Sequence, residues 1–384
     1  MKMGPGGRQP FPSFSTILQS ESLHIPVTMR IPSVQLEPLN VLVFGPTGVG
    51  KSTIINLLTN NSAQLSVGTT LESCTRSITS ASVLHKERTI NFFDTPGFDD
   101  SDTTPTEHLI LLSVSLAEMY KSTERRPNIH CVLYVHRITD NRMAGSSLTS
   151  LRVFKELIGP HVFKNLVFVT NRWSDPPVPA HIRFEHQLLH DDRYFGRAIK
   201  AGAKGGADYR ILEQPASSQA QKLLLDLFVE FNDPKVLQIQ QDLIDRNNAI
   251  GDSNAGRVVV EESNRSIESI RKNMENLRQE RSESKDDEAK KEIEGEMAGL
   301  VRRLADAEEQ RGLLRYTISQ IRNHPVLAAG VGVAGVAVAG VAVTGVAGLG
   351  AAGAAGAAEM AKVAGAAGAL VQDFYKRRHG LGPK

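Results

Sequence analysis

The 384-residue sequence predicts an α/β fold with a mainly parallel β-sheet covered by helices on both faces. Short apolar runs alternate with stretches of helical spacing over about 190 residues. A glycine-rich segment, GPTGVGKS, joins the first apolar run to the first helical stretch. The predicted strands cover residues 40–44, 78–84, 89–94, 130–136 and 166–170, and the predicted helices cover residues 53–60, 107–120, 148–158 and 219–231.

The composition is that of an ordinary globular protein, with 41% hydrophobic and 22% charged residues and a net charge of +2. This balance gives no electrostatic reason to expect nucleic acid as a partner. Only Cys74 and Cys131 occur, which excludes a disulfide framework or cysteine zinc site and favours a reducing, cytoplasmic compartment. No apolar run of signal-peptide length lies near the start of the sequence, which argues against secretion.

The glycine-rich segment matches the P-loop pattern in the context its mechanism requires, between a buried strand and a helix. Glycine lets the backbone approach a phosphate chain, whose charge the N–H groups and the helix N-terminus stabilise. Lys51 is predicted to reach the β- and γ-phosphates, and Ser52 to bind Mg²⁺. The predicted nucleotide contacts in this segment are Gly45, Pro46, Thr47, Gly48, Val49, Gly50, Lys51, Ser52 and Thr53.

A second motif, DTPG at residues 94–97, ends the third apolar run. A carboxylate at a strand tip can hold Mg²⁺ through water, so Asp94 is predicted as a metal-binding residue. The N–H of Gly97 is placed to respond to a γ-phosphate. A protein that switches between nucleotide states also needs a mobile segment between the two motifs, with a hydroxyl group that binds Mg²⁺ only when the γ-phosphate is present. Thr75 is the first choice, with Thr69 and Thr70 as alternatives.

These motifs resemble the paraseptin branch of P-loop GTPases, with its AIG-type G domain. That branch includes the immunity-associated nucleotide-binding proteins and the chloroplast outer-envelope import receptors. The resemblance covers residues 38–232 and rests on GPTGVGKS, LESCTRSI, DTPGFDD and the segment VLYVHRITDNRMAGS at residues 132–146. It implies GTP or GDP with Mg²⁺, Thr75 as the switch threonine, dimerisation across the nucleotide face, and a C-terminal extension that often ends at a membrane.

The expected guanine-reading motif departs from this pattern, because the fifth apolar run is followed by TNRWSD. An Asp is expected three residues after Asn171, yet that position is Ser174, and the Asp comes one place later, at Asp175. Either a one-residue bulge lets Asp175 read the base, or base selection is weakened. Arg172 is placed to cover the base with its aliphatic stem, and Trp173 either packs beside it or anchors the loop.

A further departure concerns hydrolysis. Many GTPases place a water-orienting Gln after the DxxG glycine, whereas this chain has Phe98, which cannot polarise water. Intrinsic hydrolysis is therefore expected to be slow, with Lys51, Thr75 and Gly97 as the catalytic residues. A partner molecule's arginine could compensate, and the candidates are Arg126, Arg137 and Arg142, with His136 and Asp140 as alternative supports of the switch segments.

Beyond this domain, Asp233-Pro234 predicts the start of a helix running toward Asp245, followed by a loop at residues 251–256. In residues 257–322, 29 of 66 positions are charged and apolar residues recur at three-four spacing, which is typical of a coiled coil. The apolar stripe lapses over residues 281–292, so either a helical hairpin or one long interrupted helix fits. A self-association region and a solvated structural helix are both compatible with this pattern.

Residues 326–358 carry no charge and consist of 13 Ala, 9 Gly, 8 Val, 2 Leu and 1 Thr. The run exceeds the roughly 20 residues that span a bilayer, but Gly and Ala contribute little transfer energy. A membrane span, a glycine-rich hairpin inserted in a membrane, and a self-associating low-complexity segment all stay open. The sequence thus predicts a tail that associates with a membrane.

The resulting organisation is a flexible arm at residues 1–38, a GTP-binding domain at 39–232, a helical region at 233–322 and the tail at 323–384. The predicted function is a Mg²⁺-dependent GTP switch that hydrolyses GTP slowly and forms a homodimer through the GTP-binding domain or the coiled coil. The alternatives are a non-hydrolysing scaffold stabilised by nucleotide, or a coiled-coil protein that associates with a membrane, and an ATPase, the last favoured only by TNRWSD.

Overall fold

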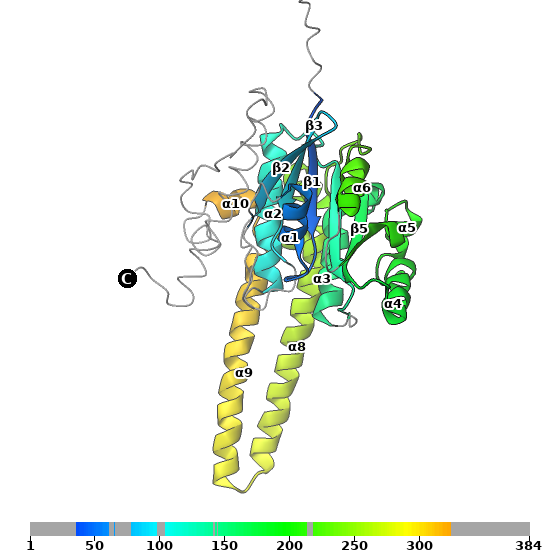
Figure 1. The fold of residues 1–384 in the computed structure, drawn as a ribbon. Helices are drawn as coiled ribbons and strands as arrows, with labels where there is room; N and C mark the ends of the chain where they lie inside the picture. Colours follow the sequence, from blue (N-terminus) through cyan, green and yellow to red (C-terminus); the bar gives the residue numbers. More distant parts are fainter. Residues whose placement is uncertain are drawn as a thin grey trace, which may run out of the picture. The chain divides into compact units, whose positions relative to one another are not determined.

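A six-stranded sheet forms the centre of the fold in the computed structural model (Figure 1). The structure describes residues 36–60, 65, 78–97, 104–140, 143, 145–212 and 218–323. The strands are β1 (Leu39–Phe44), β2 (Thr79–His85), β3 (Arg88–Asp94), β4 (Cys131–Arg137), β5 (Leu166–Trp173) and β6 (Arg210–Leu212). Their order is β2-β3-β1-β4-β5-β6, and only β2 runs antiparallel to its neighbour. The predicted α/β class and mainly parallel sheet are therefore confirmed.

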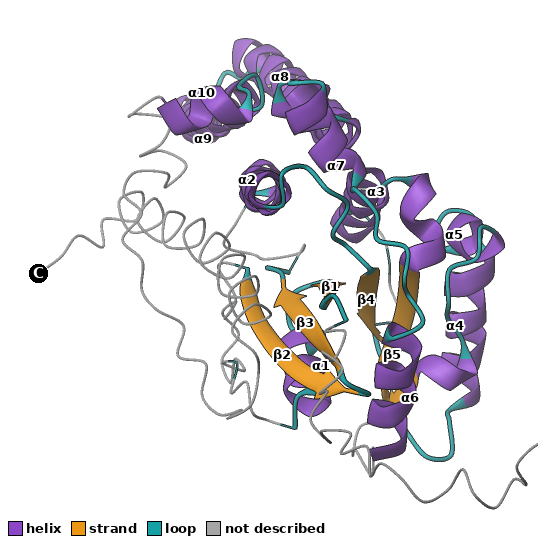
Figure 2. Cartoon of the chain, turned by 90° about the horizontal axis from the view of Figure 1, so that it is seen from above, coloured by secondary structure: helices purple, strands orange, loops and turns teal. Residues whose placement is uncertain are grey.

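Helices cover both faces of this sheet because its central strands are apolar on both sides (Figure 2). Leu42 and Phe44 of β1 pack with α2 (Pro105–Ser122) and α3 (Ser146–Ile158). The alternate residues Val41 and Val43 pack on the other face. The helices of that face are α1 (Lys51–Leu58) and α6 (Ser218–Phe228), and the first face is extended by α4 (Pro179–His190) and α5 (Gly196–Lys200).

The sequence did not predict α4, α5, β6 or the two 3-10 helices at Pro160–Asn165 and Ala207–Tyr209. The sequence prediction was also wrong about the helix at Asp233-Pro234, since Lys235 is extended and exchanges two backbone hydrogen bonds with Ile129, of 2.8 and 3.3 Å. Helical structure begins only at α7 (Gln238–Gln240), where the Gln240 side chain accepts a hydrogen bond from the Leu237 N–H at 2.9 Å. A π-helical turn then covers Gln241–Asp245.

The predicted loop at residues 251–256 is also wrong, because α8 (Asn254–Glu283) already includes Gly256. Ser253 caps this helix by accepting a hydrogen bond from the Gly256 N–H at 3.0 Å. A Cβ at Gly256 would lie 1.8 Å from the Ile250 carbonyl oxygen, so only glycine fits this tight helix entry.

The charged region forms a hairpin of α8 and α9 (Asp287–Leu313), which settles the choice that the sequence left open. The chain turns at residues 284–286, where Asp286 accepts a hydrogen bond from the Glu288 N–H at 2.9 Å. Figure 1 shows the two helices side by side. The base of α8 belongs to the core formed by α2 and α3, and the short helix α10 (Ile318–Asn323) follows α9.

No helix in the described ranges is long and apolar enough to cross a membrane. The tail at 323–384 lies outside the described residues except for its first position, and the arm at 1–38 except for its last three. The predictions for these segments stay predictions.

Candidate functional site

The P-loop leaves β1 through a backbone turn that is wedged against β4. Gly45 has φ 147° and Gly50 has φ 95°, and a Cβ on Gly45 would lie 2.3 Å from the Val135 carbonyl oxygen. Such conformations and such a close approach are open to glycine alone. The glycine positions of the motif are therefore required by the fold itself and place the loop at the carboxyl ends of β1, β3 and β4.

Lys51, the first residue of α1, is buried inside this loop. Its Nζ donates hydrogen bonds to the carbonyl oxygens of Gly45, at 3.1 Å, and Pro46, at 3.0 Å. These contacts fold the side chain back over the loop, where a lysine ammonium group could bind a phosphate chain. The cation needed for phosphate binding is thus positioned by the backbone of its own motif.

Ser52 and Asp94 come together at the start of α1 and the end of β3. The Ser52 hydroxyl donates to Asp94 Oδ2 at 2.5 Å, and Asp94 is only 1% exposed. Hydroxyl and carboxylate oxygens are the donors that Mg²⁺ prefers. The chemistry of this pair therefore fits a magnesium ion, as the sequence predicts.

Gly97 lies directly against Thr47 of the P-loop. A Cβ on Gly97 would be 2.3 Å from Thr47 Oγ1, so the DTPG turn and the P-loop share one wall of the site. The hydroxyl of Thr47 is buried and has no hydrogen-bond partner among the described residues. The predicted γ-phosphate contact by Gly97 therefore sits next to the P-loop as its proposed role requires.

The switch threonine cannot be placed. Thr69, Thr70 and Thr75 lie outside the described residues, as do Phe98 and Arg142. The roles predicted for these five positions stay predictions.

Asn171 connects the end of β5 to the P-loop. Its Nδ2 donates to the Val49 carbonyl oxygen, and its buried Oδ1 has no partner among the described residues. The residue is 7% exposed. The amide of Asn171 thus joins the loop that follows β5, called the base loop below because the sequence predicts that it reads the nucleotide base, to the P-loop. Its Oδ1 remains available to accept a hydrogen bond from a ligand.

Trp173 anchors the base loop, which decides between the two predicted roles. It is 1% exposed, its Nε1 donates to Thr170 Oγ1 at 2.8 Å, and the Arg210 guanidinium lies 4.2 Å from its ring centroid. Glu185 of α4 completes this group by accepting hydrogen bonds from Thr170 and Arg210. Sequence reasoning missed Glu185 and Arg210, because both belong to elements that carry no strong periodic signal.

The extra residue in TNRWSD is accommodated by an irregular end of β5. The pairing of β5 with β6 shifts between Thr170 and Trp173, and Arg172 adopts φ 60° with its side chain exposed. Ser174 donates to the Pro176 carbonyl oxygen at 2.9 Å. Asp175 is exposed on the loop that follows, so its carboxylate is accessible to a ligand.

Of the candidate arginines, Arg137 reaches the P-loop. Its Nη2 donates to the Gly48 carbonyl oxygen, and its Nη1 lies 3.7 Å from Asp140 Oδ1. Arg126 is mostly exposed and pairs with Glu124 at 2.8 Å. Arg137 is therefore the described candidate that touches the nucleotide-binding motif, held there in part by Asp140.

Residues 40–159 match the family model described as "50S ribosome-binding GTPase". Together with the P-loop, the DTPG turn and the strand order, this similarity gives residues 39–212 the α/β fold of P-loop GTPases. The narrower assignment to the paraseptin branch stays a prediction.

Two curated relatives are similar to the same region. The chain is 33% identical over 130 residues to GTP-binding protein A of Dictyostelium discoideum, which covers 34% of this chain and 27% of the relative. It is 32% identical over 140 residues to Translocase of chloroplast 159, chloroplastic, of Arabidopsis thaliana, covering 36% and 9%. The chain thus matches less than a third of either relative's length.

Among solved structures, Toc33 from Arabidopsis thaliana in complex with Mg²⁺ and GMPPNP is similar at 18% identity with a TM-score of 0.39. The similarity covers 53% of this chain and 88% of that one.

Three buried histidines of the domain predict a pH-dependent stability. Burial lowers the pKa of His108 to about 3, with the positive charge of Lys51 adding to it. Burial likewise lowers the pKa values of His130 and His136 to about 4. Because the unfolded chain takes up protons near the ordinary pKa of 6.5, the free energy of unfolding falls as the pH drops from about 6.5 toward 4. Each histidine contributes at most about 1.4 kcal/mol per pH unit.

The change His136→Phe tests this, since its ring lies between Phe168 and Phe184, at centroid distances of 6.3 and 5.9 Å. The variant is expected to lose less stability than the unmodified protein between pH 7 and pH 5 in urea denaturation. The exposed His186, changed in the same way, is the control. Equal losses in all three proteins would show that His136 does not carry this dependence.

Proposed function

We propose that the chain is a Mg²⁺-dependent GTP-binding switch with slow intrinsic hydrolysis. The observation that carries the proposal is the contact of Ser52 with Asp94 beside the buried Lys51, because it combines a metal-ligand pair with a phosphate-binding cation. GTP-binding protein A is a curated relative, and Toc33 has been solved with Mg²⁺ and a GTP analogue. The nucleotides and the metal named for these two proteins support GTP or GDP with Mg²⁺ as the ligands of this chain.

Selection of guanine is proposed to rest on Asn171 and Asp175. Asn171 has a buried acceptor beside the P-loop with no hydrogen-bond partner among the described residues, and Asp175 presents an exposed carboxylate on the loop after β5. A carboxylate can accept two N–H bonds from a guanine edge, whereas adenine offers no such pair of donors. This chemistry favours GTP over the alternative of ATP.

A switch also needs a route from the nucleotide to another part of the molecule. Helix α2 is the next described element after the DTPG segment, and its capping residue Thr104 donates a hydrogen bond to Gln310 of α9 at 3.0 Å. Gln310 also donates to Glu107 at 3.4 Å and is 8% exposed. A change at the DTPG turn that moves the start of α2 would therefore act on the base of the hairpin.

Slow hydrolysis and dimerisation across the nucleotide face form the finer part of the proposal. Phe98 supplies no group that can orient water, so a second positive charge is needed to stabilise the transition state. Arg137 already contacts the P-loop and can serve a nucleotide in its own site or in a partner's site. A scaffold that binds nucleotide without hydrolysis is the alternative.

Lys51→Ala is expected to weaken GTP binding about 100-fold, because the variant loses a charge-assisted contact to the β- and γ-phosphates. Titration with fluorescent GTP and ATP analogues, with Mg²⁺ and with EDTA, measures this effect. The exposed Lys272→Ala is the control and should bind normally. A preference for ATP, or no loss in Lys51→Ala, would remove the proposal.

Arg137→Ala is expected to slow single-turnover GTP hydrolysis at least tenfold, while Arg126→Ala leaves it unchanged. The rate per molecule of the unmodified protein should rise with protein concentration as dimers form. A rate that is constant over the whole concentration range contradicts activation by dimerisation. A complete absence of turnover in the presence of bound GTP would favour the non-hydrolysing scaffold.

The proposed membrane association concerns residues 326–358, which lie outside the described residues. Their uncharged length is the support for it, together with the basic cluster at Lys376, Arg377 and Arg378. The full chain is expected to sediment with liposomes that contain anionic lipids, and a chain ending at Asn323 is not. Equal recovery of both chains in the supernatant contradicts the proposal.

A further inference from the structure

The α8–α9 hairpin has two unlike sides. On one side, long charged residues bridge the helices, with Arg271 Nη2 lying 2.6 Å from Glu308 and Arg281 Nη2 lying 2.6 Å from Glu294. The opposite side contains a groove of about 480 Å³ between the helices. The charges of the region are therefore not spread evenly around it.

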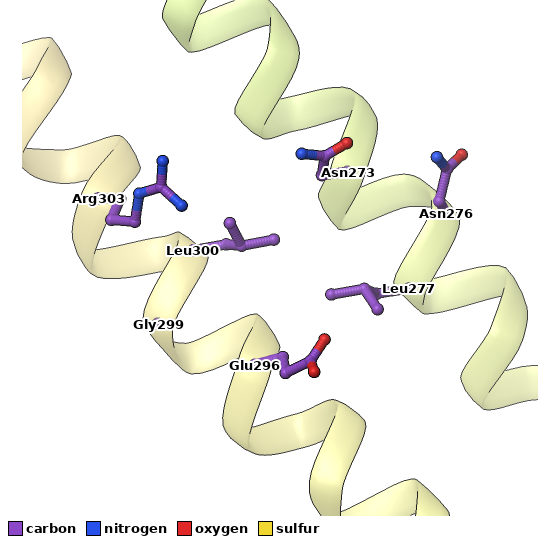
Figure 3. A pocket seen from close by; sticks show the side chains of 7 residues that line it. All are labelled: Asn273, Asn276, Leu277, Glu296, Gly299, Leu300 and Arg303. Carbon is purple, nitrogen blue, oxygen red and sulfur yellow. The ribbon is translucent and has the colours of Figure 1, made fainter.

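Neutral and small residues line much of this groove. Figure 3 shows Leu277 and Leu300 pointing toward one another across it, with Asn273 on α8 and Gly299 on α9. Neither leucine is fully buried, although both belong to the apolar stripe between the helices. The stripe is thus left partly open on this side of the hairpin.

Gly295 and Gly299 in the middle of α9, like Gly312 at its end, have space for a side chain within the described structure. A Cβ on Gly295 or Gly299 would meet nothing within 4 Å, and neither residue has a positive φ. Glycine inside a helix costs roughly 1 kcal/mol relative to alanine. The two positions are one helical turn apart on one face, so together they allow another helix to approach the backbone of α9 closely.

The charges at the ends of the groove have opposite signs. Figure 3 shows Arg303 and Glu296 on either side of Leu300 along α9. Glu296 and Arg303 are seven positions apart, roughly 10.5 Å along a helix, which is too far for an ion pair within α9. Neither side chain forms an ion pair with any other described residue.

We propose that a second copy of this chain packs its own hairpin antiparallel against the groove. The two-fold axis lies between the two grooves and crosses the helices at right angles, level with Gly299 and Leu300. A two-fold rotation about this axis places Glu296 of the first copy beside Arg303 of the second copy. It also places Arg303 of the first copy beside Glu296 of the second, so the interface contains two ion pairs. Gly295 and Gly299 let the α9 helices meet closely, and Asn273 and Asn276 supply amides that can bond across the interface.

The proposed contact differs from the dimerisation proposed for the nucleotide face. It uses neither the P-loop nor the DTPG turn, so it forms without nucleotide and in Lys51→Ala. Failure of the hairpin contact therefore leaves the GTP switch intact, and loss of GTP binding leaves the hairpin contact intact.

The test is sedimentation of the full chain across a wide concentration range, in EDTA and without nucleotide. The unmodified chain is expected to dimerise, and Gly299→Leu to raise the dissociation constant of the dimer at least tenfold. Within the monomer the leucine side chain enters open space, and leucine favours a helix more than glycine does. The thermal stability of the monomer should therefore not fall. Gly312→Leu is the matched control. Gly312 also has open space around it, but it lies one turn after Glu308, on the side of the hairpin that ion pairs bridge and outside the groove.

Charge reversal gives the sharper result. Glu296→Arg and Arg303→Glu are each expected to weaken the dimer, and the double variant is expected to restore it, because both ion pairs re-form with exchanged signs. A chain that stays monomeric throughout overturns the proposal. So does a dimer that is unchanged by Gly299→Leu, or a double variant as weak as the single ones.

Discussion

The close approach of three backbone segments around the P-loop is the constraint on which the site depends. Gly45 leaves no room for a side chain beside the Val135 carbonyl group of β4, and Gly97 leaves none beside Thr47. These contacts tie the phosphate loop to the strand on one side and to the DTPG turn on the other. A side chain at either glycine would separate the groups that must act together on one phosphate chain.

The strand order turns this local constraint into a site. Because β1 lies between β3 and β4, the loops after all three strands open at the same edge of the sheet. Ser52 can therefore reach Asp94 across 42 positions of sequence, and Asn171 of β5 can reach Val49 across 122. Each of these contacts joins one loop at this edge of the sheet to the next.

Much of this could be predicted from the sequence, because the strands are continuous apolar runs and the P-loop glycines and Lys51 follow one of them directly. Features that depend on contacts between residues far apart in the sequence could not be predicted. β6 has three residues and exists only by pairing with β5, and the role of Trp173 was open until Glu185 and Arg210 were placed around Thr170. The spacing of apolar residues along the sequence does not predict such contacts.

The hairpin shows the same distinction on a larger scale. The sequence reveals that 29 of 66 residues are charged, but only the pairing of α8 with α9 sorts them into a bridged side and a side with a groove. On the bridged side Arg271 and Arg281 are neutralised by partners within the molecule, which leaves them little to offer another chain. Gln310 of α9 accepts a hydrogen bond from Thr104, the residue that caps α2. A second hairpin bound in the groove would therefore pack on a helix whose other end contacts Thr104 and Glu107 at the start of α2, and it would leave the P-loop and the DTPG turn uncovered.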